Sequence, residues 1–138
     1  MISDSGVILA LQRTTHRTLH ALATALAELN LSAAEINALA NMADGRTRSV
    51  GQLSAETGTK ATTLTGVLDR LERRGYLVRQ TDPADRRSFR LALTEAGESA
   101  GAEVRAAVAD LERAALAALS PDQVAGFRAV VTALQEAC

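Results

Sequence analysis

The sequence predicts a mainly α-helical protein with a small β-hairpin wing, in which terminal helices flank a winged helix-turn-helix. Three observations lead to this fold class. Apolar residues recur at helical spacing over most of the 138 residues, and serine-based capping signals divide the chain into separate helices. Two short β-prone segments stand close together between helices. Residues 46–90 carry ten basic and five acidic side chains, a net charge of +5 in a chain whose total is -1.

The first two helices are set by apolar spacing and by one capping box. From Gly6 to Leu29 the apolar residues fall three or four positions apart, which predicts one long helix with a single apolar face. Ser32 and Glu35 form a capping box, so a second helix runs from about Ala33 to Ala43. It ends at Asp44–Gly45, because glycine readily takes the left-handed conformation that ends a helix.

A short helix and a longer one follow, separated by a turn. Ser49 and Gln52 repeat the capping box, and the helix that they begin ends at Thr57–Gly58. The next helix spans Lys60–Arg74, and Gly75 follows it as a C-cap glycine. Its buried stripe is predicted to consist of four aliphatic residues, Leu64, Val67, Leu68 and Leu71.

A hairpin and two more helices complete the chain. Tyr76–Arg79 and Phe89–Leu93 are β-prone, and the nine residues between them form a basic loop. A helix that starts at Thr94 is expected to reach Leu119. Ser120–Pro121 then caps and opens the last helix, with proline at the first helical position.

Composition excludes several classes of protein. The length suits one domain, or one domain with a dimerisation arm. Cys138 is the single cysteine, which excludes a disulfide framework or a cysteine-rich zinc site. No segment approaches the roughly 20 apolar residues of a membrane span and the start lacks a secretory pattern, so we expect a soluble, cytoplasmic protein with no membrane partner. With 2% aromatic residues, the chain lacks the stacking platforms that hold single-stranded nucleic acids.

The order of predicted elements in the middle of the chain is informative about function. A short helix, a Thr-Gly turn, a longer helix and a basic hairpin in succession are typical of a winged helix-turn-helix, whose second helix enters the major groove of DNA. A single threonine more often bonds to nearby backbone, but a whole set beside the +5 segment favours a surface for base edges and phosphates. The set consists of Thr59, Lys60, Thr62, Thr63 and Thr65.

Four segments of the sequence resemble the MarR family of bacterial transcription regulators. They are Thr63–Thr65, Leu68–Arg79, Asp82–Ser88 and Leu93–Gly97. The Asp-x-Arg pattern of the wing and the Leu-Thr-x-x-Gly that follows it are the most specific part of the resemblance. The order of helices on both sides also fits, so the resemblance extends over nearly the whole chain.

The resemblance implies a homodimeric regulator of transcription that binds double-stranded DNA and needs no cofactor. Residues 1–31 and 94–138 would interlock as the helical dimerisation region, and residues 32–93 would form the winged domain that grips a palindromic duplex. Family members commonly release DNA when a small anionic or aromatic molecule binds, which implies a ligand-responsive repressor. Cys138 does not match the cysteine of the peroxide-sensing members.

The wing carries the arginine that the family inserts into the minor groove. The resemblance matches Asp85 and Arg87 to that aspartate–arginine pair. A carboxylate two residues away on a tight loop would hold the guanidinium extended toward the negative potential of an A·T-rich groove. Arg86 and Arg90 would lie near phosphates. The residues expected at the DNA are Ser49, Lys60, Thr62, Thr63, Thr65, Arg70, Arg86, Arg87 and Arg90, with Asp85 as support for the wing.

The first helix carries four potential cations on neighbouring turns, Arg13, His16, Arg17 and His20. If some of them face a pocket, they would suit a carboxylate-bearing aromatic effector, whereas solvated helix charges are the alternative. His16 and His20 share a helix face. A metal site needs three or four ligands, so we expect no metal there.

Two other functions are weighed against DNA binding. An enzyme is not expected, because the acidic residues are scattered among caps and helix faces, no glycine-rich phosphate loop follows a strand, and Cys138 has no neighbouring base. The nearer alternative is a winged-helix module for protein–protein interaction without sequence-specific DNA binding. Such a module would not need the hydroxyls of the recognition helix and the wing arginines together.

Overall fold

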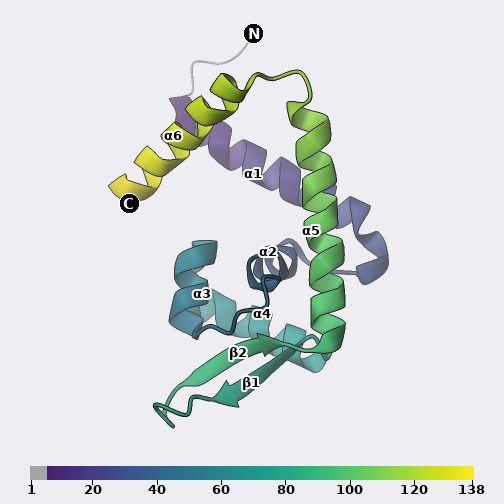
Figure 1. The fold of residues 1–138 in the computed structure, drawn as a ribbon, viewed down its shortest axis with the longest axis vertical. Coiled ribbons are helices and arrows are strands. Elements are labelled where there is room, and N and C mark those ends of the chain that lie inside the picture. Colours follow the sequence, from purple (N-terminus) through teal and green to yellow (C-terminus); the bar gives the residue numbers. More distant parts are fainter. Residues whose placement is uncertain (1–5) are drawn as a thin grey trace. The chain divides into compact units, whose positions relative to one another are not determined.

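The computed structural model describes residues 6–138 and has six α-helices and a two-stranded antiparallel wing in this part of the chain (Figure 1). The predicted fold class is therefore confirmed. By contacts the chain divides into two compact units, one up to Ala107 and one from Val108 to Cys138, and the division falls within the fifth helix. In chain order the elements are α1 (Gly6–Ala25), the 3-10 turn η1 (Ala27–Leu29), α2 (Ala33–Met42), α3 (Val50–Thr57), α4 (Ala61–Arg73), β1 (Leu77–Thr81), β2 (Phe89–Leu93), α5 (Glu95–Leu116) and α6 (Pro121–Ala137).

The first helix is shorter than its apolar spacing predicts. α1 ends at Ala25 rather than at Leu29, and the chain then tightens into η1. Asn30 takes the left-handed conformation with φ of 50°, and its N–H donates to the carbonyl of Ala27. Because Leu26 is buried, the apolar period continues past the end of α1, and spacing alone does not separate a 3-10 turn from a further α-helical turn.

Three reciprocal capping boxes begin helices α2, α3 and α6. In each, the serine hydroxyl accepts the N–H of the third helical residue, whose side chain accepts the N–H of the serine. These are the caps that the sequence predicts, and each helix begins at the next residue. The pairs are Ser32 with Glu35, Ser49 with Gln52, and Ser120 with Gln123.

The helix-turn-helix is built on an aliphatic core. α3 and α4 are joined at Gly58, whose φ of 68° is the left-handed conformation that the Thr-Gly turn predicts. The predicted stripe of α4 is buried, which leaves the opposite side of that helix exposed. The large side chains that are almost fully buried are Ile36, Leu39, Met42, Leu53, Leu64, Val67, Leu68, Leu71, Leu77, Leu91 and Val104.

The wing is a hairpin with a longer first strand than predicted. β1 continues to Thr81, which pairs with Phe89, so the connecting loop is Asp82–Ser88 and not the nine residues expected. The N–H of Asp82 donates to the carbonyl of Ser88 and closes the loop. On the other edge of the hairpin, Arg48 forms an isolated antiparallel bridge with Leu91 of β2. The wing is therefore attached by backbone bonds to the connection between α2 and α3.

The start of α5 lies against the turn between α4 and β1. The hydroxyl of Thr94 accepts the N–H of Gly97 and donates to the carbonyl of Gly75. A Cβ on Gly97 would lie 1.9 Å from the carbonyl oxygen of Tyr76, so this approach requires glycine. The Leu-Thr-x-x-Gly pattern thus joins the winged domain to α5.

The second unit consists of the end of α5 and α6. α5 ends at Leu116, three residues before the predicted Leu119, whose N–H donates to the carbonyl of Leu116 in a turn that leads into the cap of α6. Phe127 of α6 leaves 59% of its surface exposed. Among the described residues, no helix is both long and apolar enough to span a bilayer.

Candidate nucleic-acid interface

The recognition helix α4 exposes the residues that the sequence places at its amino end. Lys60 is the N-cap residue and makes no capping bond through its side chain. Lys60, Thr62 and Thr63 are all exposed, whereas Leu64 is buried in the next position. An ammonium group and two hydroxyls therefore stand at the positive end of a helix dipole, where phosphate oxygens are favoured.

Two of the predicted hydroxyls already have local partners. The hydroxyl of Thr65 donates to the carbonyl of Ala61 at 3.0 Å, within the same helix. The hydroxyl of Ser49 accepts the N–H of Gln52 at 3.1 Å as part of its capping box. Each oxygen keeps a further hydrogen-bonding site, but these two bonds are the ones that single hydroxyls commonly make.

The tip of the wing is ordered by its aspartates. Asp82 accepts the N–H of Ala84, and Asp85 accepts the N–H of Arg87 at 3.0 Å. The expectation that Asp85 holds the guanidinium of Arg87 is corrected here, because the carboxylate binds the backbone of that residue. Arg86 and Arg87 are exposed, and within residues 6–138 their side chains form no ion pair.

Two other predicted DNA residues are engaged with the protein. Arg90 of β2 donates through Nε to the hydroxyl of Thr47 at 2.9 Å and through Nη2 to the carbonyl of Thr47 at 3.2 Å. Arg70 has its Nε 3.9 Å from a carboxylate oxygen of Glu35 and keeps 47% of its side chain exposed. Arg90 thus braces the wing against the connection before α3, and Arg70 faces α2.

Arg74 and Arg79 hold the carboxyl end of α4 to its neighbours. The guanidinium of Arg74 donates to the carbonyls of Leu29 and Asn30, lies 3.4 Å from Glu35 and is 5.2 Å from the ring centre of Tyr76. Arg79 of β1 forms an ion pair with Asp69 of α4 at 2.8 Å. These cations therefore contribute to internal contacts and not only to the surface charge.

Arg48 is a buried cation that the sequence does not reveal. Its guanidinium contacts Asp44 at 2.6 Å and Glu56 at 2.8 Å, and only 4% of its side chain is exposed. The Arg48 guanidinium and the N–H of Arg46 hold the pKa of the Asp44 carboxyl well below its usual range, and Asp44 in turn raises the pKa of Arg48. The four-residue spacing from Asp44 to Arg48 is a local signal for one pair, but the approach of Glu56 depends on tertiary packing.

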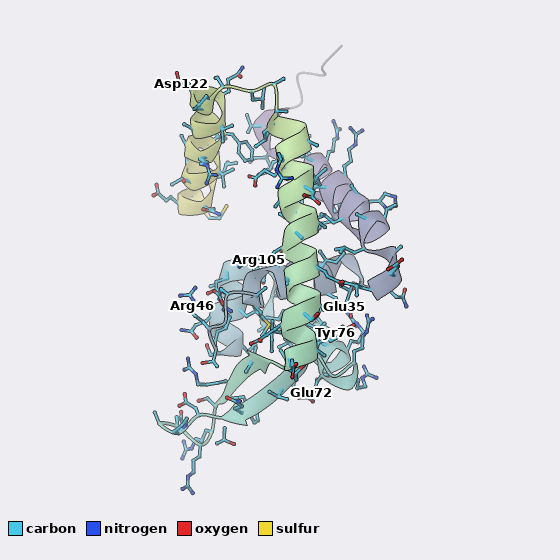
Figure 2. All side chains as sticks on the ribbon, turned by 45° about the vertical axis from the view of Figure 1, so that its right-hand side comes forward. Glu35, Arg46, Glu72, Tyr76, Arg105 and Asp122 are labelled. Carbon is cyan, nitrogen blue, oxygen red and sulfur yellow. The ribbon has the colours of Figure 1, made fainter. Side chains whose placement is uncertain are left out.

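The four cations of α1 are exposed in the structure. A pocket of about 80 Å³ lies elsewhere in the first unit and is lined by residues of α2, β2, α5 and the connection after α2. Arg46, one of its lining residues, is labelled in Figure 2. No group of three or more metal-binding side chains occurs among residues 6–138. The described first unit thus does not bring Arg13, His16, Arg17 and His20 to this pocket.

The fold and the exposed basic surface define a winged helix-turn-helix protein of the DNA-binding class. A family model described as MarR family matches residues 29–88, which include α2, α3, the recognition helix α4, β1 and the wing loop. Over these residues the chain is similar to the MarR family.

Solved structures are similar to the chain over almost its whole length. A protein of Pseudomonas aeruginosa described as a probable transcriptional regulator is 29% identical with a TM-score of 0.72, and the match covers 93% of this chain and 96% of that one. BpsR of Bordetella bronchiseptica is 22% identical, with a TM-score of 0.80 and coverage of 97% and 96%. CouR of Rhodococcus jostii RHA1 is 24% identical, with a TM-score of 0.82 and coverage of 95% and 92%. A search of curated proteins found no match.

Proposed function

We propose that the chain is a ligand-responsive repressor that binds a palindromic DNA operator as a homodimer. The observation that carries this proposal is the exposed set of Lys60, Thr62 and Thr63 at the start of α4, together with exposed Arg86 and Arg87 on the wing. Helix and wing residues of this kind suit the two grooves of one duplex, because hydroxyls and amines read the major groove and arginine favours a narrow minor groove.

In this proposal, residues 32–93 bind DNA and residues 1–31 and 94–138 form the dimer. Lys60 binds a phosphate at the amino end of α4, and Thr62 and Thr63 approach base edges. Arg87 enters the minor groove, and Arg86 lies beside a phosphate. Two winged domains related by a two-fold axis require half-sites about one helical turn apart, since the symmetry of the operator follows that of the protein. The regulator acts in the cytoplasm.

A small anionic or aromatic effector is the second part of the proposal. The comparison structures are described as regulation of DNA binding of BpsR by 6-hydroxynicotinic acid and as CouR bound to p-coumaroyl-CoA, and both molecules are aromatic. Arg13, His16, Arg17 and His20 of α1 are the side chains that we propose for the carboxylate of such a molecule. In this proposal, the pocket is completed by a surface of the second chain beside these exposed cations.

Binding of random-sequence duplex in a gel-shift assay distinguishes the regulator from a winged-helix module for protein partners. A DNA-binding regulator at micromolar concentration should slow the migration of the duplex in the gel. The complex should dissociate as the salt concentration rises, because phosphate contacts release counterions. No retardation at low salt would favour the interaction module. Calorimetric titration with salicylate-like acids, on the parent, Arg13→Ala and Arg17→Ala, tests the effector separately, and binding unchanged in both variants would remove the α1 cations from the proposal.

A further inference from the structure

The buried guanidinium of Arg48 links two helices of the winged domain. Its Nη1 and Nη2 donate to the two carboxylate oxygens of Asp44, two residues after the end of α2, at 3.1 and 2.6 Å. Its Nε lies 2.8 Å from the carboxylate of Glu56 in α3, and Nη1 also donates to the carbonyl of Arg46. We name Asp44, Arg48 and Glu56 the Arg48 clamp.

The backbone of the same residue holds the wing. The N–H of Arg48 donates to the carbonyl of Leu91 at 3.2 Å, and the N–H of Leu91 donates to the carbonyl of Arg48 at 2.7 Å. The preceding Thr47 binds the side chain of Arg90 through its hydroxyl and its carbonyl. Strand β2 is therefore attached to the helix-turn-helix through the two residues whose position the clamp fixes.

The chemistry of the clamp favours a role in orientation over one in stability. Burial of a guanidinium costs hydration, and a well-packed apolar residue is often as stabilising in such a place. A bidentate pair does fix direction, because both donors of the planar guanidinium must meet both carboxylate oxygens. Asp44 and Glu56 keep 24% and 37% of their side chains exposed, so loss of Arg48 would leave carboxylates that water still reaches.

The ion pair on the other strand of the wing is more exposed. Arg79 of β1 pairs with Asp69 of α4, and these side chains are 27% and 48% exposed. Solvent and salt screen such a pair, so it restrains the wing less than a buried cluster does. Among the ion pairs that hold the wing, the Arg48 cluster is therefore the most buried restraint.

We propose that the Arg48 clamp is a positioning device that sets the wing against α3 and α4, so that Arg87 reaches the minor groove while α4 occupies the major groove. This inference rests on the proposed DNA-binding function. Arg48 does not touch DNA in this proposal. It acts through the wing, and its loss removes the contribution of Arg87 but not that of Lys60.

A double-mutant cycle tests this separation. Affinities for one A·T-flanked duplex are measured for the parent, Arg48→Met, Arg87→Ala and the double variant. A second cycle, in which Lys60→Ala replaces Arg87→Ala, is the matched control. We expect Arg87→Ala to weaken binding about tenfold in the parent but less than about twofold beside Arg48→Met. Lys60→Ala should keep its full effect in both backgrounds. Losses from Arg48→Met and Arg87→Ala that multiply as independent factors would overturn the proposal.

Hydrogen exchange of the Leu91 amide tests the clamp without DNA. This N–H bonds to Arg48, so in Arg48→Met we expect its exchange to accelerate about tenfold or more while the amide of Leu68 in α4 keeps its protection. Unchanged exchange at Leu91 would refute the clamp. If the parent protein binds no duplex, the proposed function is refuted. Hydrogen exchange of the Leu91 amide would still test whether the clamp fixes the wing. If Arg48→Met does not fold, Glu56→Gln removes one partner and should produce both effects at smaller size.

Discussion

The basic side chains of residues 46–90 separate into two groups by what they contact. One group contacts carboxylates or carbonyls of the protein and consists of Arg46, Arg48, Arg70, Arg73, Arg74, Arg79 and Arg90. Lys60, Arg86 and Arg87 are exposed and form no ion pair in the described part of the chain. The charge available to DNA is therefore concentrated at the start of α4 and at the wing tip, and it is smaller than the net charge of the segment suggests.

Arg87→Ala and Lys60→Ala should weaken DNA binding in different ways. Lys60, as a phosphate contact, should lower affinity for all duplexes and reduce the salt slope by about one unit. Arg87→Ala should reduce the free energy of DNA binding by about 1–2 kcal/mol, mainly where the flanks are A·T-rich, because a narrow minor groove concentrates negative potential. Fluorescence anisotropy over a range of salt concentrations measures both effects.

The matched control for this pair is Arg113→Ala. Arg113 lies on α5, is exposed and pairs locally with Asp110, so its removal changes the net charge equally. Its variant should bind within about twofold of the parent, since an exposed charge that makes no proposed DNA contact acts weakly through a screening solvent. Equal losses of Arg87→Ala on A·T-rich and G·C-rich flanks would contradict the minor-groove assignment.

Lowering the pH should reduce the contribution of Asp44 to the free energy of unfolding. The pKa of Asp44 is depressed in the folded chain, so its stabilisation is complete above its unfolded pKa of about 4 and is lost progressively as the pH falls from there toward the lower folded pKa. Asp44→Asn should be about 1–2 kcal/mol less stable than the parent at pH 7, and the difference should shrink toward pH 2. Urea unfolding at several pH values measures it, and a difference independent of pH would show that the Asp44 charge is not the cause.

Local sequence signals predict which residues of the proposed DNA interface are exposed better than they predict the buried contacts behind it. The hydroxyls and Lys60 of α4 follow from the helical period, because the aliphatic stripe fixes which side remains exposed. From the sequence alone, Arg48 cannot be distinguished from the other cations of this basic segment. Its burial depends on Glu56 and Leu91, which approach only after α3 and the wing have packed, and no local period records that contact.

The start of α5 is the element most sensitive to a single methyl group. Gly97→Ala would place a Cβ 1.9 Å from the carbonyl oxygen of Tyr76, and backbone must move to relieve it. We expect a loss of about 3 kcal/mol or more in the free energy of unfolding. Gly126→Ala in α6 is the matched control, because nothing lies within 4 Å of its added Cβ. It should gain about 0.5–1 kcal/mol from helix propensity, and a similar loss in both variants by thermal unfolding would contradict the close approach.

Element boundaries follow the sequence where a side chain defines them. The three capping boxes start their helices as predicted, since cap and helix are within four residues. The end of α1 and the length of the wing loop were predicted wrongly. η1 continues the apolar spacing of α1, and Thr81 extends β1 through pairing with Phe89, whose position depends on the closure of the loop.

The whole molecule is expected to be a dimer. Val7, Ile8 and Leu9 of α1 and Phe127 and Val130 of α6 are exposed in the single chain. Apolar surface of this kind is seldom left bare in solution, and isologous pairing of two copies would cover it. Light scattering should give the mass of two chains at micromolar concentration, and a monomer at that concentration would contradict the assignment of the terminal helices to dimerisation.

Selection of bound duplexes from a random pool tests the central claim, which is sequence-specific recognition of a palindromic operator. The account predicts enrichment of an inverted repeat with half-sites about 10 base pairs apart, bound by two chains per duplex in sedimentation. Affinity for the selected duplex should exceed that for random duplex by about a thousandfold or more. A pool that enriches no sequence, or a complex that contains one chain per duplex, would contradict it.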